Sequence, residues 1–161
     1  MKLLPALLAI CASVPFAAEA QEYKIIHTYP EQGAGLYGVA FGDSGWQRDF
    51  DRSYRAGGAA AALPMAAREA RDGNAVAMRI LGLAYARGEG VNRDDRIAVG
   101  WFRKAAARGD ATAMYALGLA YWHGAGVTRN PTTAGHWLVA ASSRGERRAR
   151  TALAQLAKIP S

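Results

Sequence analysis

The residues that could carry out chemistry gather first in a glycine-rich stretch, GAGLYGVAFGDSG, at 33–45. Its first part matches G-x-G-x-x-G, the pattern of a loop that binds the phosphates of a dinucleotide. Such a loop needs a strand before it, a helix directly after it and an acidic residue about twenty positions later. VAFGDSG cannot begin a long helix, and no βαβ pattern follows it. We therefore interpret this part as a loop or hairpin.

A second short match, Gly42-Asp43-Ser44-Gly45, has the residues that surround a serine nucleophile. A nucleophilic serine needs a histidine base that a buried acid orients. His27 is the only histidine that precedes Ser44, and Trp46 stands where trypsin-like proteases have another glycine. The chain is also too short for the two β-barrels of such a protease. We therefore expect no protease activity.

Metal and thiol chemistry also lack their usual residues. His27, His123 and His136 are not at metal-binding spacing, and no HExxH is present. Cys11 is the only cysteine. Asp94 and Asp95 fit a helix cap and a favourable first-turn charge better than a catalytic pair. We predict no cofactor, no metal site and no enzymatic activity.

The first 20 residues, MKLLPALLAICASVPFAAEA, have the layout of a secretory signal peptide. An early lysine precedes an apolar run, which ends in the small-x-small sequence Ala18-Glu19-Ala20. A retained anchor is less favoured, because Pro5 and Pro15 leave the run short of the roughly 20 residues that a membrane span needs. We predict cleavage after Ala20 and a periplasmic or secreted protein.

The charge balance predicts an acidic partner. The formal net charge is +7, from 20 Lys and Arg against 13 Asp and Glu. A basic surface attracts an acidic protein, an anionic lipid surface or an acidic polymer. Nucleic acid is a poor expectation for an exported chain. No apolar run after the signal is long enough to cross a membrane.

Any site must be positioned by the secondary-structure elements, and the sequence of these elements is repeated along the chain. LGLAYARGEGV at 81–91 returns as LGLAYWHGAGV at 117–127, and 17 of 36 positions are identical between 73–108 and 109–144. A fixed period of this size is typical of stacked supersecondary units. In each unit the apolar spacing predicts two helices.

Local signals place the ends of these helices. Gly88 is expected to close the first helix in the left-handed conformation, and Asp94 to cap the second. Asn130 is the equivalent cap, with Pro131 at the first helical position. Gly82 and Gly118 lie in mid-helix, where each costs about 1 kcal/mol relative to alanine. We therefore expect a neighbouring helix to lie where a side chain would be.

The pattern [A]-x3-LG-x2-Y-x2-G-x-GV, followed by a cap and A-x2-W, resembles the Sel1-like repeat, a relative of the tetratricopeptide repeat. The resemblance implies an all-α fold, an α-solenoid of stacked antiparallel helix pairs, preceded by a short arm that is a β-hairpin or extended. In the opening unit, Pro64 is expected to start or kink the second helix. The predicted parts are a signal peptide (1–20), an N-terminal arm (21–45), a degenerate opening unit (46–72), two Sel1-like repeats (73–108 and 109–144) and a C-terminal capping helix (145–161).

In repeats of this kind the first helix of each unit lines a concave face. Aligning the units on LG-x2-Y predicts a basic groove with an aromatic patch, and such residues are enriched at binding hot spots. The alternative is that the charges serve solubility and that Trp122 packs against the arm. The predicted groove residues are Arg48, Arg52, Arg55, Arg79, Leu83, Arg87, Tyr115, Leu119, Trp122 and His123.

The resemblance implies a non-enzymatic periplasmic adaptor or scaffold that binds a protein partner with an acidic surface. One alternative is an immunity protein, because some periplasmic Sel1-like proteins neutralise secreted antibacterial effectors such as phospholipases. A further alternative is an anionic-polymer binder. A β-lactam-related enzyme is less favoured, because secreted relatives of that type carry a disulfide in each repeat and this chain has a single cysteine.

Overall fold

The computed structural model describes residues 45–158, so the predicted signal peptide and all of the predicted arm except Gly45 lie outside it. Within this range the chain forms six helices and no strand. They are α2 (Gly45–Arg71), α3 (Ala75–Arg87), α4 (Asp95–Ala107), α5 (Ala111–His123), α6 (Pro131–Ser143) and α7 (Arg147–Leu156).

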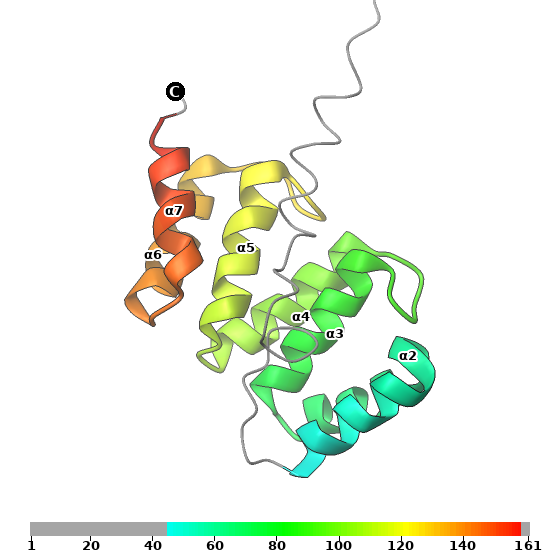
Figure 1. Ribbon diagram of the computed structural model, residues 1–161. Helices are drawn as coiled ribbons and strands as arrows, with labels where there is room; N and C mark the ends of the chain where they lie inside the picture. The colour runs from blue at the N-terminus through cyan, green and yellow to red at the C-terminus, as the bar shows by residue number, and fades with distance from the viewer. Residues whose placement is uncertain (1–44, 159–161) are drawn as a thin grey trace, which may run out of the picture.

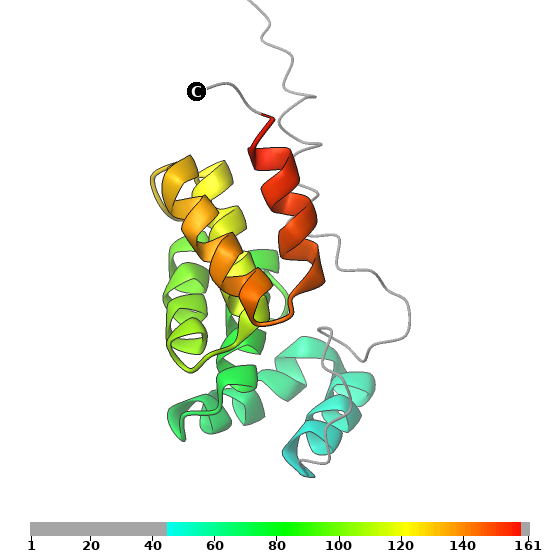
Figure 2. The ribbon, with the colours of Figure 1, turned by 90° about the vertical axis from the view of Figure 1, so that its left-hand side faces the viewer.

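The helices stack in antiparallel pairs. α3 packs most closely on α4 and α5 on α6, while α2, the α3–α4 pair, the α5–α6 pair and α7 follow one another along the stack (Figure 1). Figure 2 shows α6 and α7 side by side at the end of the stack, with α2 at the other end. The prediction of an all-α repeat fold is confirmed.

The predicted helix ends are found where the sequence placed them. The Asp94 carboxylate accepts hydrogen bonds from the backbone N–H groups of Arg96 and Ile97. Asn130 accepts one from Thr133 at 2.9 Å, with Pro131 as the first helical residue. Gly88 closes α3 with a φ of 71°.

The mid-helix glycines mark close approach between paired helices. A Cβ atom placed on Gly82 would lie 2.5 Å from Cε1 of Phe102, and one on Gly118 would lie 2.6 Å from Cγ of Leu138. Phe102 and Leu138 are buried and occupy equivalent positions in the two units. The absent side chains therefore allow the second helix of each unit to pack on the first.

The opening unit breaks at a different residue from the one predicted. α2 is two helices joined at Gly58, whose backbone is non-helical (φ 70°, ψ −167°), and Pro64 lies inside the second of them. The prediction that Pro64 starts or kinks the helix is therefore wrong. Glycine adopts a positive φ without steric cost, so the turn forms at Gly58 instead.

The 36-residue period nevertheless extends through this unit. The second half of α2 begins 36 residues before α4, and a Cβ atom on Gly90 would lie 2.6 Å from the backbone N of Ala60. One period later, a Cβ atom on Gly126 would collide with the backbone carbonyl of Asp95. The loop glycine of each unit thus packs on the start of the second helix of the unit before it.

The core is continuous along the stack and rich in alanine. Its largest fully buried side chains are Phe50, Ile80, Leu83, Leu117, Leu119 and Leu138. Trp101 and Trp137 are only partly buried and pack against this core from the second helices. Among residues 45–158, none of the helices has the length and apolar content that crossing a membrane requires.

Candidate protein-interaction face

The ten predicted groove residues fall into three groups in the structure. Three arginines of α2 are exposed, three residues at the ends of α3 and α5 are partly buried, and four residues in the middle of α3 and α5 are buried. The structure therefore supports the predicted exposure only for part of the set.

The exposed group forms a stripe along one side of α2. Arg48, Arg52 and Arg55 are four and three residues apart, which places them on one helix face. They line a hollow together with Asp51 and Ala56. We call Arg48, Arg52 and Arg55 the α2 arginines.

The charges around this hollow are mostly positive. Arg52 pairs with Asp49 at 3.1 Å, but both side chains are largely exposed, so water screens the pair. Burial raises the pKa of the Asp51 carboxyl, and the nearby Arg55 guanidinium opposes that rise. A negative group on a partner would therefore meet a local excess of cations.

The partly buried group lies at the C-terminal ends of the two inner helices. The rings of Trp122 and His123 stack with centroids 5.3 Å apart and planes 11° from parallel. Trp122 also packs against the core. Arg87, the equivalent of His123 one period earlier, pairs with Glu89 at 3.4 Å. Part of each ring and of the Arg87 guanidinium is accessible to a partner, but the accessible area is smaller than at fully exposed positions.

The third group contradicts the prediction of a solvent-facing groove. Arg79, Leu83, Tyr115 and Leu119 are 5%, 1%, 8% and 2% exposed. The alignment on LG-x2-Y assumed that one side of each inner helix faces solvent. In fact every residue of 77–84 in α3 and of 113–120 in α5 is buried. The role of these four residues in binding a partner stays a prediction, but their exposure is not observed.

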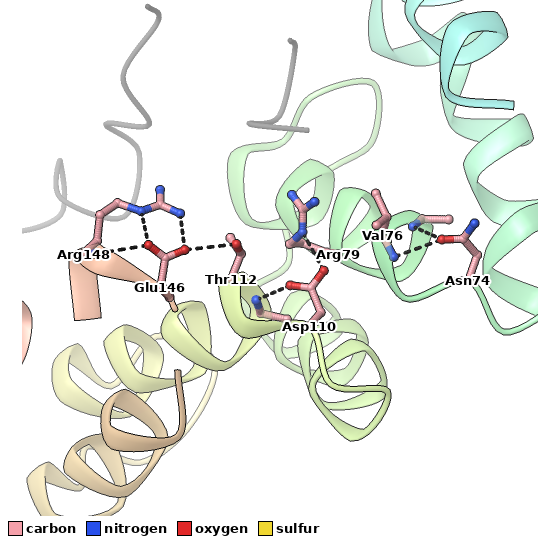
Figure 3. Close-up of polar contacts among 9 residues, drawn as sticks. Asn74, Val76, Arg79, Asp110, Thr112, Glu146 and Arg148 are labelled. Carbon is pink, nitrogen blue, oxygen red and sulfur yellow. Dashed lines mark hydrogen bonds and ion pairs between the residues drawn. The ribbon is translucent and has the colours of Figure 1, made fainter. Parts of the chain in front are cut away.

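Arg79 is held by an ion pair between two repeats. Its Nε donates to Oδ2 of Asp110 at 3.0 Å, and both side chains are less than a tenth exposed (Figure 3). The other oxygen of Asp110 accepts from the backbone N–H of Ala113 at 2.7 Å and so caps α5. One carboxylate therefore both starts a helix and neutralises a buried cation from the preceding unit.

The junction between α5 and α7 also contains a cation beside a cap carboxylate, but the residues differ. Tyr115 occupies the position of Arg79, and the Arg148 guanidinium of α7 lies 5.0 Å from its ring centroid. Glu146, which caps α7, accepts from Arg148 and also from the Thr112 hydroxyl of α5 at 3.1 Å (Figure 3). These contacts join α5 to α7.

Two pKa shifts follow from this arrangement. Hydrogen bonding from Arg148 lowers the pKa of Glu146, in spite of the desolvation that opposes it. Burial raises the pKa of the Tyr115 hydroxyl, with Arg148 acting in the opposite direction and Glu146 in the same one. Near neutral pH the junction therefore holds a charged Glu146–Arg148 pair beside a neutral tyrosine.

The cap residues of the inner helices, α3, α5 and α7, are not among the residues predicted from the sequence. Asn74, Asp110 and Glu146 stand one period apart, each directly before an inner helix, and each accepts from backbone N–H groups of its helix. The signal was available, because Asn and Asp are preferred N-caps and the spacing repeats at 36 residues.

The described residues show no group suited to a metal. Residues 45–158 contain no cluster of three or more His, Cys, Asp or Glu side chains that could hold an ion. The arrangement offers cations and stacked rings, which suit non-covalent recognition.

The comparisons with known proteins agree with this architecture. The Sel1 repeat family model matches residues 75–110 and 111–146. The chain is a Sel1-like repeat protein. Sel1 repeats are generally protein–protein interaction modules, and the family is typically a non-catalytic scaffold. The search of curated proteins found no match.

Two solved structures are similar to this Sel1-like repeat protein. The Sel1 repeat protein from Oxalobacter formigenes is 33% identical with a TM-score of 0.62, and the match covers 66% of this chain and 32% of that one. The protective antigen c5321 of uropathogenic Escherichia coli, which displays an SLR fold, is 24% identical with a TM-score of 0.64. That match covers 89% of this chain and 34% of the antigen, and it supports the fold alone. The chain thus spans about a third of the length of both proteins.

Proposed function

We propose that this chain is an exported adaptor that binds an acidic surface of a protein partner, with the α2 arginines as the main contact. The observation that carries the proposal is the exposed stripe of Arg48, Arg52 and Arg55 around one hollow. Arginine forms paired hydrogen bonds with carboxylates, so a cluster of this kind suits Asp and Glu side chains.

The aromatic pair supplies the second part of the proposed contact. Trp122 and His123 end α5, and Arg87 ends α3 in the equivalent position. Tryptophan and arginine are among the residues that contribute most to binding energy at protein interfaces. Within the proposal, the arginines attract and orient the partner, and the Trp122 ring gives it an apolar contact.

A capture experiment tests the proposal. The chain is used to capture proteins from an envelope extract, beside the variant R48Q/R52Q/R55Q. R93Q/R96Q/K158Q serves as a control, because it removes the same charge from exposed side chains away from α2 and spares Arg129, which donates to the Trp122 carbonyl at 3.0 Å. We expect one protein to be retained by the wild type and the control, and lost with the α2 variant.

The remaining outcomes are equally informative. Equal capture by all three proteins refutes a role for the α2 arginines. Equal loss of capture in both variants shows that capture depends on net charge and not on the α2 arginines in particular. The identity of a captured partner separates an adaptor in an assembly from an inhibitor of a secreted effector. Circular dichroism melting of each variant establishes that it is folded.

Export rests on the signal-like sequence of residues 1–20, which lies outside the described residues. We expect the periplasmic fraction of cells that produce the full chain to contain a protein that begins at Gln21. Mass spectrometry of the intact protein measures this directly. A chain that retains residues 1–20 in the membrane fraction contradicts cleavage after Ala20.

A further inference from the structure

In the turns between units, the acidic side chains are nearly buried and the arginine side chains are exposed at one edge of the stack. The turns that join one unit to the next read Arg108-Gly109-Asp110 and Arg144-Gly145-Glu146. In both, the acid points inward as a helix cap, with side chains 9% and 10% exposed. The arginine that precedes it ends the previous helix and is exposed. Each turn is nearly neutral in composition but presents a cation to solvent.

This sorting leaves the second half of the stack positive at its surface. From Arg96 to Lys158 the chain has two acids, Asp110 and Glu146, and both are caps with basic partners. The same range has nine exposed cations, namely Arg96, Arg103, Lys104, Arg108, Arg129, Arg144, Arg147, Arg150 and Lys158. No exposed carboxylate side chain in this range opposes them.

Four of these cations belong to the unit-joining turns. Lys104 lies in the last turn of α4, Arg108 and Arg144 are the C-cap residues of α4 and α6, and Arg147 is the first residue of α7. The α2–α3, α4–α5 and α6–α7 turns lie along one edge of the stack, opposite the loops that join the helices of each pair (Figure 1). We call Lys104, Arg108, Arg144 and Arg147 the turn-edge cations.

Helix electrostatics accounts for only part of this set. Cations at a helix C-terminus are favoured by the helix dipole, which explains Lys104, Arg108 and Arg144. Arg147 is at the N-terminus of α7, where the dipole disfavours a cation. In the described part of the chain, neither Arg144 nor Arg147 forms an ion pair. A negative ligand at this edge would offset the unfavourable charge of Arg147.

We infer that the turn edge binds a linear acidic polysaccharide. Arg108 and Arg144 are one period apart, in neighbouring units that lie on the order of 10 Å apart. The α2–α3 turn has the exposed Asp72 at the equivalent position, so the cationic part of the edge is formed by the α4–α5 and α6–α7 turns. A chain that carries a regular series of carboxylates can therefore meet successive turns. This surface is separate from the α2 arginines, so the inference goes beyond the proposed protein-binding role.

The composition of the edge favours a polysaccharide over an acidic protein. Protein interfaces depend on a few buried aromatic or apolar anchors. The exposed large apolar side chains of the described residues are Ile97 and Val139, which lie in the first turn of α4 and the middle of α6, away from the turns. Trp101 is partly buried, and Nζ of Lys104 lies over its ring at 4.2 Å from the centroid, so the lysine covers this ring face. A hydrated polyanion needs no such anchor and binds through charge and hydrogen bonding.

The test measures binding of fluorescently labelled polygalacturonate by anisotropy at several salt concentrations. The purified full chain is compared with K104Q/R144Q/R147Q, which spares Arg108 because its guanidinium donates to the Gly73 carbonyl at 2.8 Å. The matched control is R93Q/R96Q/K158Q, which removes the same charge from the opposite edge and spares Arg129, because Arg129 donates to the Trp122 carbonyl at 3.0 Å.

We expect the turn-edge variant to bind about 10- to 100-fold more weakly, since it lacks three of the cations that neutralise charges of the polyanion. Its affinity should also fall less steeply with salt, because fewer counterions are released. The control should lose less than about threefold. Equal losses in both variants would refute a site at the turn edge, and so would the absence of wild-type binding.

Two further arms identify the ligand class. Poly-L-glutamate at equal charge concentration should bind at least about tenfold more weakly than polygalacturonate, since a flexible peptide loses more backbone entropy on ordering. Preference for the peptide would overturn the polysaccharide assignment. R48Q/R52Q/R55Q should bind the polysaccharide nearly as well as the wild type, so failure here is distinguishable from failure of the proposed protein-binding site.

Discussion

Replacing the mid-helix glycines with alanine tests whether the spacing of the paired helices depends on an absent side chain. Gly82 of α3 and Gly118 of α5 are the two positions at which an added Cβ atom would collide with a buried side chain of the paired helix. Gly100 of α4 is a third mid-helix glycine, but an added Cβ atom there would meet nothing within 4 Å. The chain therefore contains its own control.

The expected magnitudes follow from two opposing terms. Alanine is favoured over glycine in a helix by about 1 kcal/mol, and this gain applies to all three positions. At Gly82 the new methyl group would lie 2.5 Å from Phe102, which is 3% exposed and cannot swing into solvent. Overpacking of this kind costs about 1–3 kcal/mol. Because the helix term cancels, G82A should be less stable than G100A by about 1–3 kcal/mol.

The free energy of unfolding is measured by urea denaturation of wild type, G82A, G118A and G100A. We expect G100A to unfold at higher urea than the wild type. G82A and G118A should unfold at lower urea than G100A, with unchanged m-values. If G82A is stabilised as much as G100A, the helices separate without cost and the close-approach argument is wrong. Replacing Phe102 with leucine should reduce the cost of G82A, as a double-mutant cycle can show.

Two other predictions concern the cap residues. Asp110→Ala should destabilise the fold by about 3–5 kcal/mol, because it breaks a buried ion pair as well as a cap. Asn74→Ala removes a cap alone and should cost about 1 kcal/mol. Similar urea midpoints for the two variants would refute the importance of the Arg79–Asp110 pair. The pKa of Glu146 is lowered in the folded state, so its stabilisation is fully present above the ordinary carboxyl pKa of about 4.3 and is lost as the pH falls through the lower folded value. The difference in unfolding free energy between wild type and Glu146→Gln should therefore be constant from neutral pH to about pH 5 and shrink below about pH 4, and a difference that grows on acidification would contradict the sign of the shift.

The sequence predicted the helices because their signals are local. The repeat at 36 residues, the caps at Asp94 and Asn130, and the left-handed Gly88 all lie within a few residues of the feature that they determine. Gly82 and Gly118 were informative for a different reason. Glycine weakens a helix, yet it is present at the equivalent position of both repeats. This indicates that helix packing stabilises the fold by more than glycine destabilises the helix.

The opening unit shows where local reasoning failed. Pro64 is the stronger helix breaker, yet the chain breaks at Gly58. The second half of α2 begins one period before α4, so the repeat register decides where this helix starts. Packing of the Gly90 loop on Ala60 fixes that register, and this contact joins residues that are 30 positions apart. No window of the sequence around Pro64 contains that information.

The groove was harder to predict than the helices, because an inner helix that is buried on all sides has no periodic solvent face. The hydrophobic pattern of α5 is nearly uniform around the helix, and eight consecutive positions from Ala113 to Ala120 are buried. Aligning such a helix on its neighbours identifies equivalent positions but not exposed ones. By contrast, the exposure of the α2 arginines agrees with the prediction, because α2 lies at the end of the stack and packs mainly on α3.

Differences between copies of a repeat therefore need not indicate contact with a partner. Arg79 and Tyr115 occupy one position in successive units, and both belong to the predicted groove. In the structure Arg79 reaches forward to the cap of α5, whereas Tyr115 receives Arg148 from α7. Each junction keeps one cation beside one cap carboxylate, but the cation comes from the preceding helix in the first junction and from the following helix in the second. The residue at this position is therefore determined by contacts with the neighbouring unit. The candidate binding surfaces are the exposed α2 arginines and the turn edge.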